Sequence, residues 1–359
     1  MRGSFKITEI AGIPIKVHLT FLLLPFIWRE MFPLAIALFM LVTLHELAHS
    51  LVAMRFGIKV REITLLPIGG VAQMTTLPKT SYQEFLISLA GPLTNVAIAV
   101  IFYYPVKWIA GPDIFFSAFR LTNIAIQVSF GDYLKIMLSL LYWLNIMLAV
   151  FNLLPAFPMD GGRILRSLLV KSIGFRRATK VAVNFGYAFS FIFLIAGLQH
   201  SLMLMVIAVF IYLGATSEEF QSQVKTTLKQ FRVRDILTKE FLTLHENATF
   251  QSVLELIFHT RQEDFPVVDQ RTGGMVGFIT RSDITSGIHQ FGINANISAV
   301  MRRDIPTVSE STGLDEVQSI MASNEIRALP VIRDGNIIGV ITTYDINRVY
   351  SMMGQRAKR

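Results

Sequence analysis

The sequence predicts a polytopic α-helical membrane domain followed by a soluble α/β domain. Charged residues make up only 16% of the 359 residues, whereas soluble proteins carry about 25%. The long apolar runs all lie in the first 215 residues, and the chain becomes charged and mixed from Glu218 onward. We therefore expect a transmembrane domain at 1–217, a linker at 218–230 and a second domain at 231–359.

Six apolar segments are candidates for transmembrane helices. A helix needs about 20 apolar residues to cross the hydrocarbon core. The second, third and fourth segments are long enough, whereas the first and the last two must tilt or recruit flanking residues. The segments lie near 18–28, 32–54, 82–106, 134–155, 184–198 and 201–215.

The basic residues of the short connections predict the orientation. If six helices cross in alternation, the basic sets before the first segment, between the second and third, and after the fourth share one face. Short cytoplasmic loops are enriched in Lys and Arg. We therefore expect a multi-pass protein of the cell membrane with both termini and the second domain in the cytoplasm. The same rule accounts for the net charge of +8, so we expect no nucleic-acid partner.

Residues 58–77 are too interrupted for a helix. Pro67 with Gly69 and Gly70 predicts the turn of a β-hairpin. Two interpretations stay open. The segment is either a plain cytoplasmic loop or a hairpin whose free edge pairs with an extended peptide.

The second apolar segment contains the motif HELAH at 45–49. His45 and His49 are four residues apart, so they share one face of a helix and can hold one metal ion. Glu46 is then placed to take a proton from water at that metal. Ionisable groups inside a transmembrane helix are costly and indicate function. The alternative is a buried polar network that joins helices.

A catalytic zinc usually has three protein ligands, and this chain has no cysteine to supply one. Among the few other candidates, His18 and His200 lie near the ends of apolar segments. Asp160 is the strongest candidate, because the prolines of the motif NLLPAFPMDGG at 152–162 end the fourth helix and let the aspartate turn back into the bundle. Asn152 of the same motif either caps freed backbone groups or contacts a substrate.

These motifs, together with the stretch SLAGPLTN between them, resemble the site-2 protease family of intramembrane metalloproteases. The likeness covers residues 1–215. It implies one Zn²⁺ per chain held by His45, His49 and Asp160, with Glu46 as the general base. It also implies hydrolysis of a peptide bond within or near a transmembrane segment of a substrate protein.

The soluble part contains an internal repeat. GFITRSD at 277–283 recurs as GVITTYD at 339–345, and each copy is preceded by a Pro-Val strand and an amphipathic helix. The two copies, at about 231–289 and 295–350, resemble a tandem pair of CBS domains.

The CBS resemblance implies an adenine nucleotide, ATP or AMP, as a regulatory ligand. Its ribose and phosphate contacts would come from Thr280, Asp283, Thr342 and Asp345. Ligand binding would then change the domain arrangement and gate access to the protease. The alternative is a structural or dimerising module in which both aspartates cap helices, and a homodimer through the CBS domains also stays open.

Two other function classes are alternatives to a zinc metalloendopeptidase. A CBS-regulated ion transporter or channel is the main alternative, but residues 1–215 show no repeated halves with broken helices. A non-catalytic homologue that only binds membrane proteins is disfavoured, because all four predicted site residues are present.

Overall fold

The computed structural model describes residues 3–23, 32–66, 69–76, 78–117, 129–237, 240–260, 262–324 and 326–356. The chain divides into two compact units, Met1–Ser222 and Gln223–Arg359.

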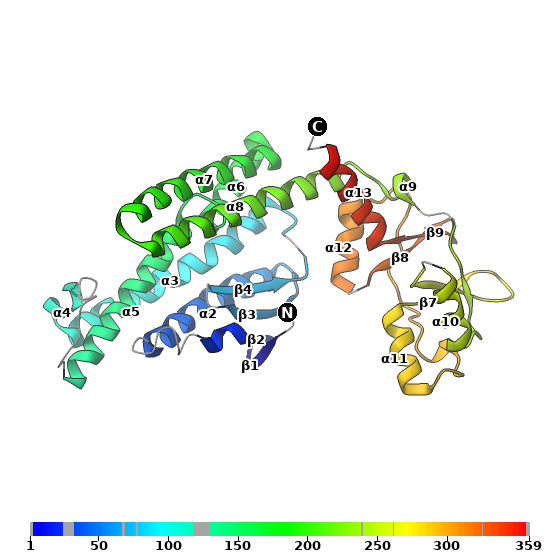
Figure 1. The fold of residues 1–359 in the computed structure, drawn as a ribbon, viewed down its shortest axis with the longest axis horizontal. Helices are drawn as coiled ribbons and strands as arrows, with labels where there is room; N and C mark the ends of the chain where they lie inside the picture. Colours follow the sequence, from blue (N-terminus) through cyan, green and yellow to red (C-terminus); the bar gives the residue numbers. More distant parts are fainter. Residues whose placement is uncertain are drawn as a thin grey trace. The chain divides into compact units, whose positions relative to one another are not determined.

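Five helices of the first unit are long and apolar enough to cross a membrane (Figure 1). Many of their large apolar side chains are exposed, for example Trp108 at 87% and Val100 at 69%, as expected of surfaces that face lipid rather than water. The helices are α2 (Phe32–Arg55), α3 (Ser81–Ala110), α5 (Phe130–Leu153), α7 (Phe175–His200) and α8 (Leu202–Leu228).

The first predicted transmembrane segment, near 18–28, is described only in part. His18 ends strand β2, and Leu19–Leu23 forms the 3-10 helix η1. The rest of that segment lies outside the described residues.

A four-stranded sheet accompanies these helices, in the order β1-β2-β3-β4. Strands β3 and β4 pair antiparallel and confirm the predicted hairpin, although Pro67 lies outside the described residues and both glycines belong to β4. The N-terminal hairpin was not predicted. Buried apolar residues of β2 and β3 pack with Leu47 of α2, so the sheet is attached to the helix that carries HELAH; they are Ile13, Ile15 and Val17 of β2 and Ile63 and Leu65 of β3. The strands are β1 (Ser4–Ile10), β2 (Ile13–His18), β3 (Val60–Leu66) and β4 (Gly69–Met74).

The basic segment after the fourth apolar run is helical rather than a loop. Helix α6 (Asp160–Ile173) is strongly amphipathic, with Gly161, Gly162 and Arg166 among its buried residues. The short helix α4 (Pro112–Ser117) precedes α5. Helix α8 continues to Leu228, so most of the predicted linker at 218–230 is helical.

The second unit contains the two predicted repeats, each with its own apolar core. Both have a helix, an antiparallel strand pair and a following helix, because the same alternation of apolar residues occurs twice. The first comprises α9 (Val233–Ile236), β5 (Leu244–His245), α10 (Phe250–His259), β6 (Phe265–Val268), β7 (Met275–Ile279) and α11 (Arg281–Phe291). The second comprises η3 (Ile297–Ala299), α12 (Leu314–Asn324), β8 (Ala328–Arg333), β9 (Asn336–Thr342) and α13 (Thr343–Arg356).

Candidate metal centre

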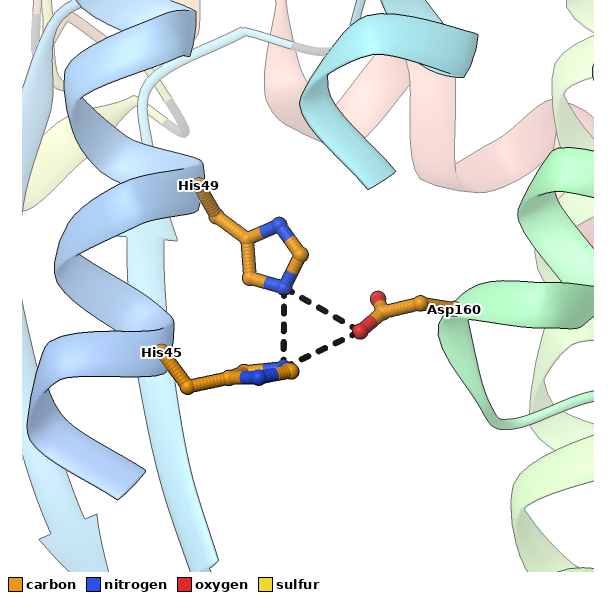
Figure 2. Close-up of side chains that lie close together, drawn as sticks. All are labelled: His45, His49 and Asp160. Carbon is orange, nitrogen blue, oxygen red and sulfur yellow. Dashed lines mark hydrogen bonds and ion pairs between the residues drawn. The ribbon is translucent and has the colours of Figure 1, made fainter. Parts of the chain in front are cut away.

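The structure brings together three predicted ligands from two helices that are far apart in sequence (Figure 2). His45 and His49 project from one face of α2, and Asp160 is the first residue of α6. The Nε2 atoms of the two histidines are 3.1 Å apart, and each lies 3.1 Å from Oδ2 of Asp160. Both imidazoles are buried, so the cluster is shielded from bulk solvent.

A hydrogen bond orients the ring of His49. The Nδ1 atom of His49 lies 2.6 Å from the carbonyl oxygen of Ile87 on α3. A carbonyl can only accept, so Nδ1 carries a proton, and Nε2 is the nitrogen that faces His45 and Asp160. Such an outer contact is the usual way in which a metal-binding histidine is oriented.

The three atoms have the spacing that zinc requires. With bonds of about 2.0–2.1 Å, tetrahedral ligands lie roughly 3.3 Å from one another, close to the observed triangle with 3.1 Å edges. Two imidazoles and a carboxylate are also a donor set that zinc accepts at catalytic sites, where the fourth position is left open. The residues therefore fit a zinc ion.

Two glycines let neighbouring backbone approach this cluster. A Cβ atom on Gly91 of α3 would lie 2.3 Å from Nε2 of His49 and 2.6 Å from Nε2 of His45. A Cβ atom on Gly70 of β4 would lie 2.7 Å from Cγ of Glu46. The side chain of Glu46 thus lies directly against the edge strand β4, next to the two histidines.

Close packing also holds the segment that leads to Asp160. A Cβ atom on Gly161 would lie 2.2 Å from the carbonyl oxygen of Leu154, and one on Gly186 of α7 would lie 2.5 Å from that of Phe157. Side chains larger than hydrogen at these positions would push the loop away. The loop 154–159 is therefore clamped between α6 and α7.

Asn152, the remaining predicted residue of the first unit, bonds within its own helix. Its Nδ2 atom donates to the carbonyl oxygen of Leu148 at 3.0 Å. The closeness of Gly70 to Glu46 and of Gly91 to the histidines was not predicted from the sequence. The only signal was their place in the glycine-containing stretches LLPIGG and SLAGP.

The four predicted nucleotide-binding residues form two equivalent caps in the second unit. The hydroxyl of Thr280 donates to Asp283 at 2.7 Å, and that of Thr342 donates to Asp345 at 2.7 Å. The surroundings differ. Thr342 and Asp345 line a cavity of about 1060 Å³. Asp283 instead forms a bidentate ion pair with Arg302, with Nε–Oδ2 and Nη2–Oδ1 distances of 3.0 and 2.9 Å.

The electrostatics of the first cap follow from that ion pair. Burial alone would raise the pKa of Asp283, but the hydrogen bonds from Arg302 and Thr280 hold the pKa of this carboxyl below its usual range. The charged form of Asp283 is therefore favoured, and its oxygens are already engaged by protein donors.

Comparison with known proteins identifies relatives of both units. Residues 33–195 match the model of Peptidase family M50, and residues 233–290 and 297–351 each match that of the CBS domain. Zinc metalloprotease MJ0392 of Methanocaldococcus jannaschii is 34% identical, over 98% of this chain and 98% of the relative.

Two solved structures are also similar. A site-2 protease from Methanocaldococcus jannaschii is 38% identical, covering 60% of this chain and 95% of that one, with a TM-score of 0.44. The CBS domain pair of protein MJ0100, in complex with 5′-methylthioadenosine and S-adenosyl-L-methionine, is 29% identical, covering 34% of this chain and 98% of that one, with a TM-score of 0.32.

Proposed function

Because the chain belongs to peptidase family M50, the site-2 proteases, and carries a CBS pair, we propose that it hydrolyses a peptide bond within or near a transmembrane segment of a substrate protein. The family and the enzyme class, a zinc metalloprotease, are those that the sequence predicted. The observation that carries the proposal is the 3.1 Å triangle of His45, His49 and Asp160 beside membrane-spanning helices.

The roles of the residues follow from their places. His45, His49 and Asp160 would hold the zinc ion, which when bound polarises a peptide carbonyl and acidifies water. Glu46 follows His45 on α2, so its carboxylate is available as general base. It takes a proton from the attacking water and passes it to the leaving amine. The buried histidines and the clamped loop 154–159 keep this arrangement rigid.

The edge strand β4 is the best candidate to hold the substrate. A transmembrane helix hides its carbonyls in its own hydrogen bonds, so the segment to be cut must first become extended. Strand β4 pairs with β3 on one side and ends the sheet on the other, among the described strands. A peptide added to that edge would run past Gly70 and therefore past Glu46.

We place both termini and the CBS pair in the cytoplasm. Helix α6, between α5 and α7, carries Arg163, Arg166 and Lys171, and a basic connection between membrane helices favours the cytoplasmic face. Asp160 begins this helix, so the centre lies near that face. Water would reach Glu46 from the cytoplasm.

An adenine nucleotide, ATP or AMP, is the proposed regulatory ligand. The cavity beside Thr342 and Asp345 contains two arginines, Arg327 and Arg348, which suit phosphate groups. The CBS pair of MJ0100 was solved with adenosine compounds. Binding would change cleavage only if the ligand prefers one conformation of the chain, and a homodimer through the CBS pair is compatible with this scheme.

Cleavage of a transmembrane test substrate by the purified full-length protein in detergent tests the proposal. Wild type and Glu46→Ala are compared, and the zinc content of both is measured. We expect the variant to keep zinc and lose cleavage. Absence of zinc from the wild type would refute the metal centre. Equal cleavage by both proteins would refute the role of Glu46.

A further inference from the structure

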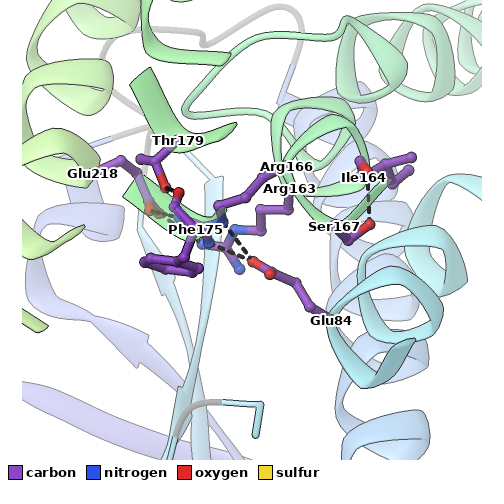
Figure 3. Close-up of polar contacts among 8 residues, drawn as sticks. All are labelled: Glu84, Arg163, Ile164, Arg166, Ser167, Phe175, Thr179 and Glu218. Atoms are coloured by element: carbon purple, nitrogen blue, oxygen red, sulfur yellow. Dashed lines mark hydrogen bonds and ion pairs between the residues drawn. The ribbon is translucent and has the colours of Figure 1, made fainter. Parts of the chain in front are cut away.

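Helix α6 carries a second charged group besides Asp160. Arg166 follows that residue by six positions, about 9 Å along the helix axis. Only 10% of its side chain is exposed. Its Nε atom donates to Oε1 of Glu84 on α3 at 2.9 Å, and Nη2 also bonds that oxygen (Figure 3). Nη1 reaches Oε2 of Glu218 on α8 at 3.4 Å.

Two aromatic rings complete the environment of this guanidinium. Its central carbon lies 4.7 Å from the ring centroid of Phe157 and 5.0 Å from that of Phe175. Phe157 is fully buried and belongs to the loop that leads into Asp160. Arg166, on the helix that begins with Asp160, therefore also contacts the loop before Asp160 and the first residue of α7.

The ion pairs are balanced in charge. Arg163 places Nη2 3.3 Å from Oε1 of Glu218, so two arginines of α6 face two glutamates, one from α3 and one from α8. A planar guanidinium can bond two carboxylates in fixed directions while it stacks on rings, which a lysine cannot do. The arrangement fixes the direction of α6 as well as its distance from α3.

Helix α3 contacts both helices that carry the candidate ligands, α2 through His49 and α6 through Arg166. Glu84 precedes Ile87 by three residues, so the two lie on the same side of α3. Ile87 orients His49 through its carbonyl oxygen, and Glu84 anchors Arg166. The same turn of α3 therefore positions both His49 and the helix that begins with Asp160.

We propose that Arg166 is a positioning residue, which holds α6 and Phe157 so that Asp160 stays at ligand distance from His45 and His49. The proposal rests on the proposed zinc centre. Removal of contacts that orient metal ligands typically changes metal affinity by about 10–100-fold.

Zinc affinity of the full-length protein in detergent, measured by competition with a chromophoric chelator, tests the role. We expect Arg166→Gln to weaken zinc binding by about 10–100-fold. Arg166→Lys should recover part of the loss, because the charge returns without the two-directional bonding. Glu84→Gln should lie between Arg166→Gln and wild type. Arg176→Gln is the matched control, since Arg176 is an exposed arginine in the next helix, and its zinc affinity should equal that of wild type.

The outcomes that would refute the role of Arg166 differ from the outcome that would refute the proposed function. If Arg166→Gln lowers the melting temperature but binds zinc as tightly as wild type, the residue is only structural and the proposal is wrong. If that variant does not fold, Glu84→Gln and Arg166→Lys decide on the same criterion. Failure of wild type itself to bind zinc would instead refute the proposed function.

Discussion

Gly91→Ala separates the requirements of the metal centre from those of the fold. The residue lies inside α3, where alanine is favoured over glycine by about 0.5–1 kcal/mol. The added methyl group would, however, lie 2.3 Å from Nε2 of His49 and 2.6 Å from Nε2 of His45. The same substitution that favours the helix would therefore obstruct the two histidines.

The size of the displacement follows from these distances. Ordinary contacts of a Cβ atom begin at about 3.4 Å, so the ring of His49 must move by the difference between 3.4 and 2.3 Å, about 1.1 Å. The hydrogen bond from Nδ1 to the carbonyl oxygen of Ile87, at 2.6 Å, opposes that movement. A zinc site tolerates deviations of only about 0.2 Å in its ligand distances. We therefore expect loss of zinc and of cleavage.

The assay combines zinc content per chain, cleavage of a transmembrane substrate, and thermal unfolding with and without a metal chelator. Gly131→Ala is the control, because the nearest atom to its added methyl group lies at 3.9 Å. In chelator, Gly91→Ala should unfold no more than a few degrees from wild type. Stoichiometric zinc and wild-type cleavage in Gly91→Ala would show that the packing argument is wrong.

Five further predictions concern the base, the edge strand, the metal and two aspartates of the second unit. Glu46→Gln should keep zinc but lower the cleavage rate by at least about 10²–10⁴-fold; an unchanged rate would exclude Glu46 as the base. Gly70→Ala should reduce cleavage without loss of zinc, because its methyl group would lie 2.7 Å from Cγ of Glu46, and parallel loss of zinc would contradict this. A strong chelator should abolish cleavage and added Zn²⁺ should restore it, whereas chelator-resistant cleavage would exclude a metal mechanism. The pKa of Asp283 is lowered in the folded protein, so the stability that this carboxylate contributes is present above its unfolded pKa and is lost as the pH falls through its folded pKa. Asp283→Asn should therefore make the unfolding free energy of the CBS pair less dependent on pH in the acid range. Asp345→Asn should weaken the binding of ATP or AMP, measured by calorimetry.

The sequence alone determined the fold class and the candidate ligands, because both depend on local patterns. Apolar runs of sufficient length predict membrane helices, and five of them are present among the described residues. The four-residue spacing of His45 and His49 fixes their common face through helix geometry alone. Asp160 was predictable because prolines end the preceding helix in a motif with a family resemblance.

The tertiary structure decided which groups surround those candidate ligands. In the sequence, Arg166 is only one of the basic residues that follow the fourth apolar segment, yet its side chain is nearly buried between α3 and α8. Its partners Glu84 and Glu218 are 82 and 52 residues away, and no local period relates positions so far apart. The closeness of Gly91 to the histidines and of Gly70 to Glu46 likewise depends on how α3 and β4 pack on α2. A glycine contributes no side chain to a hydrophobic pattern, so only the folded structure shows which neighbouring group occupies the space beside it.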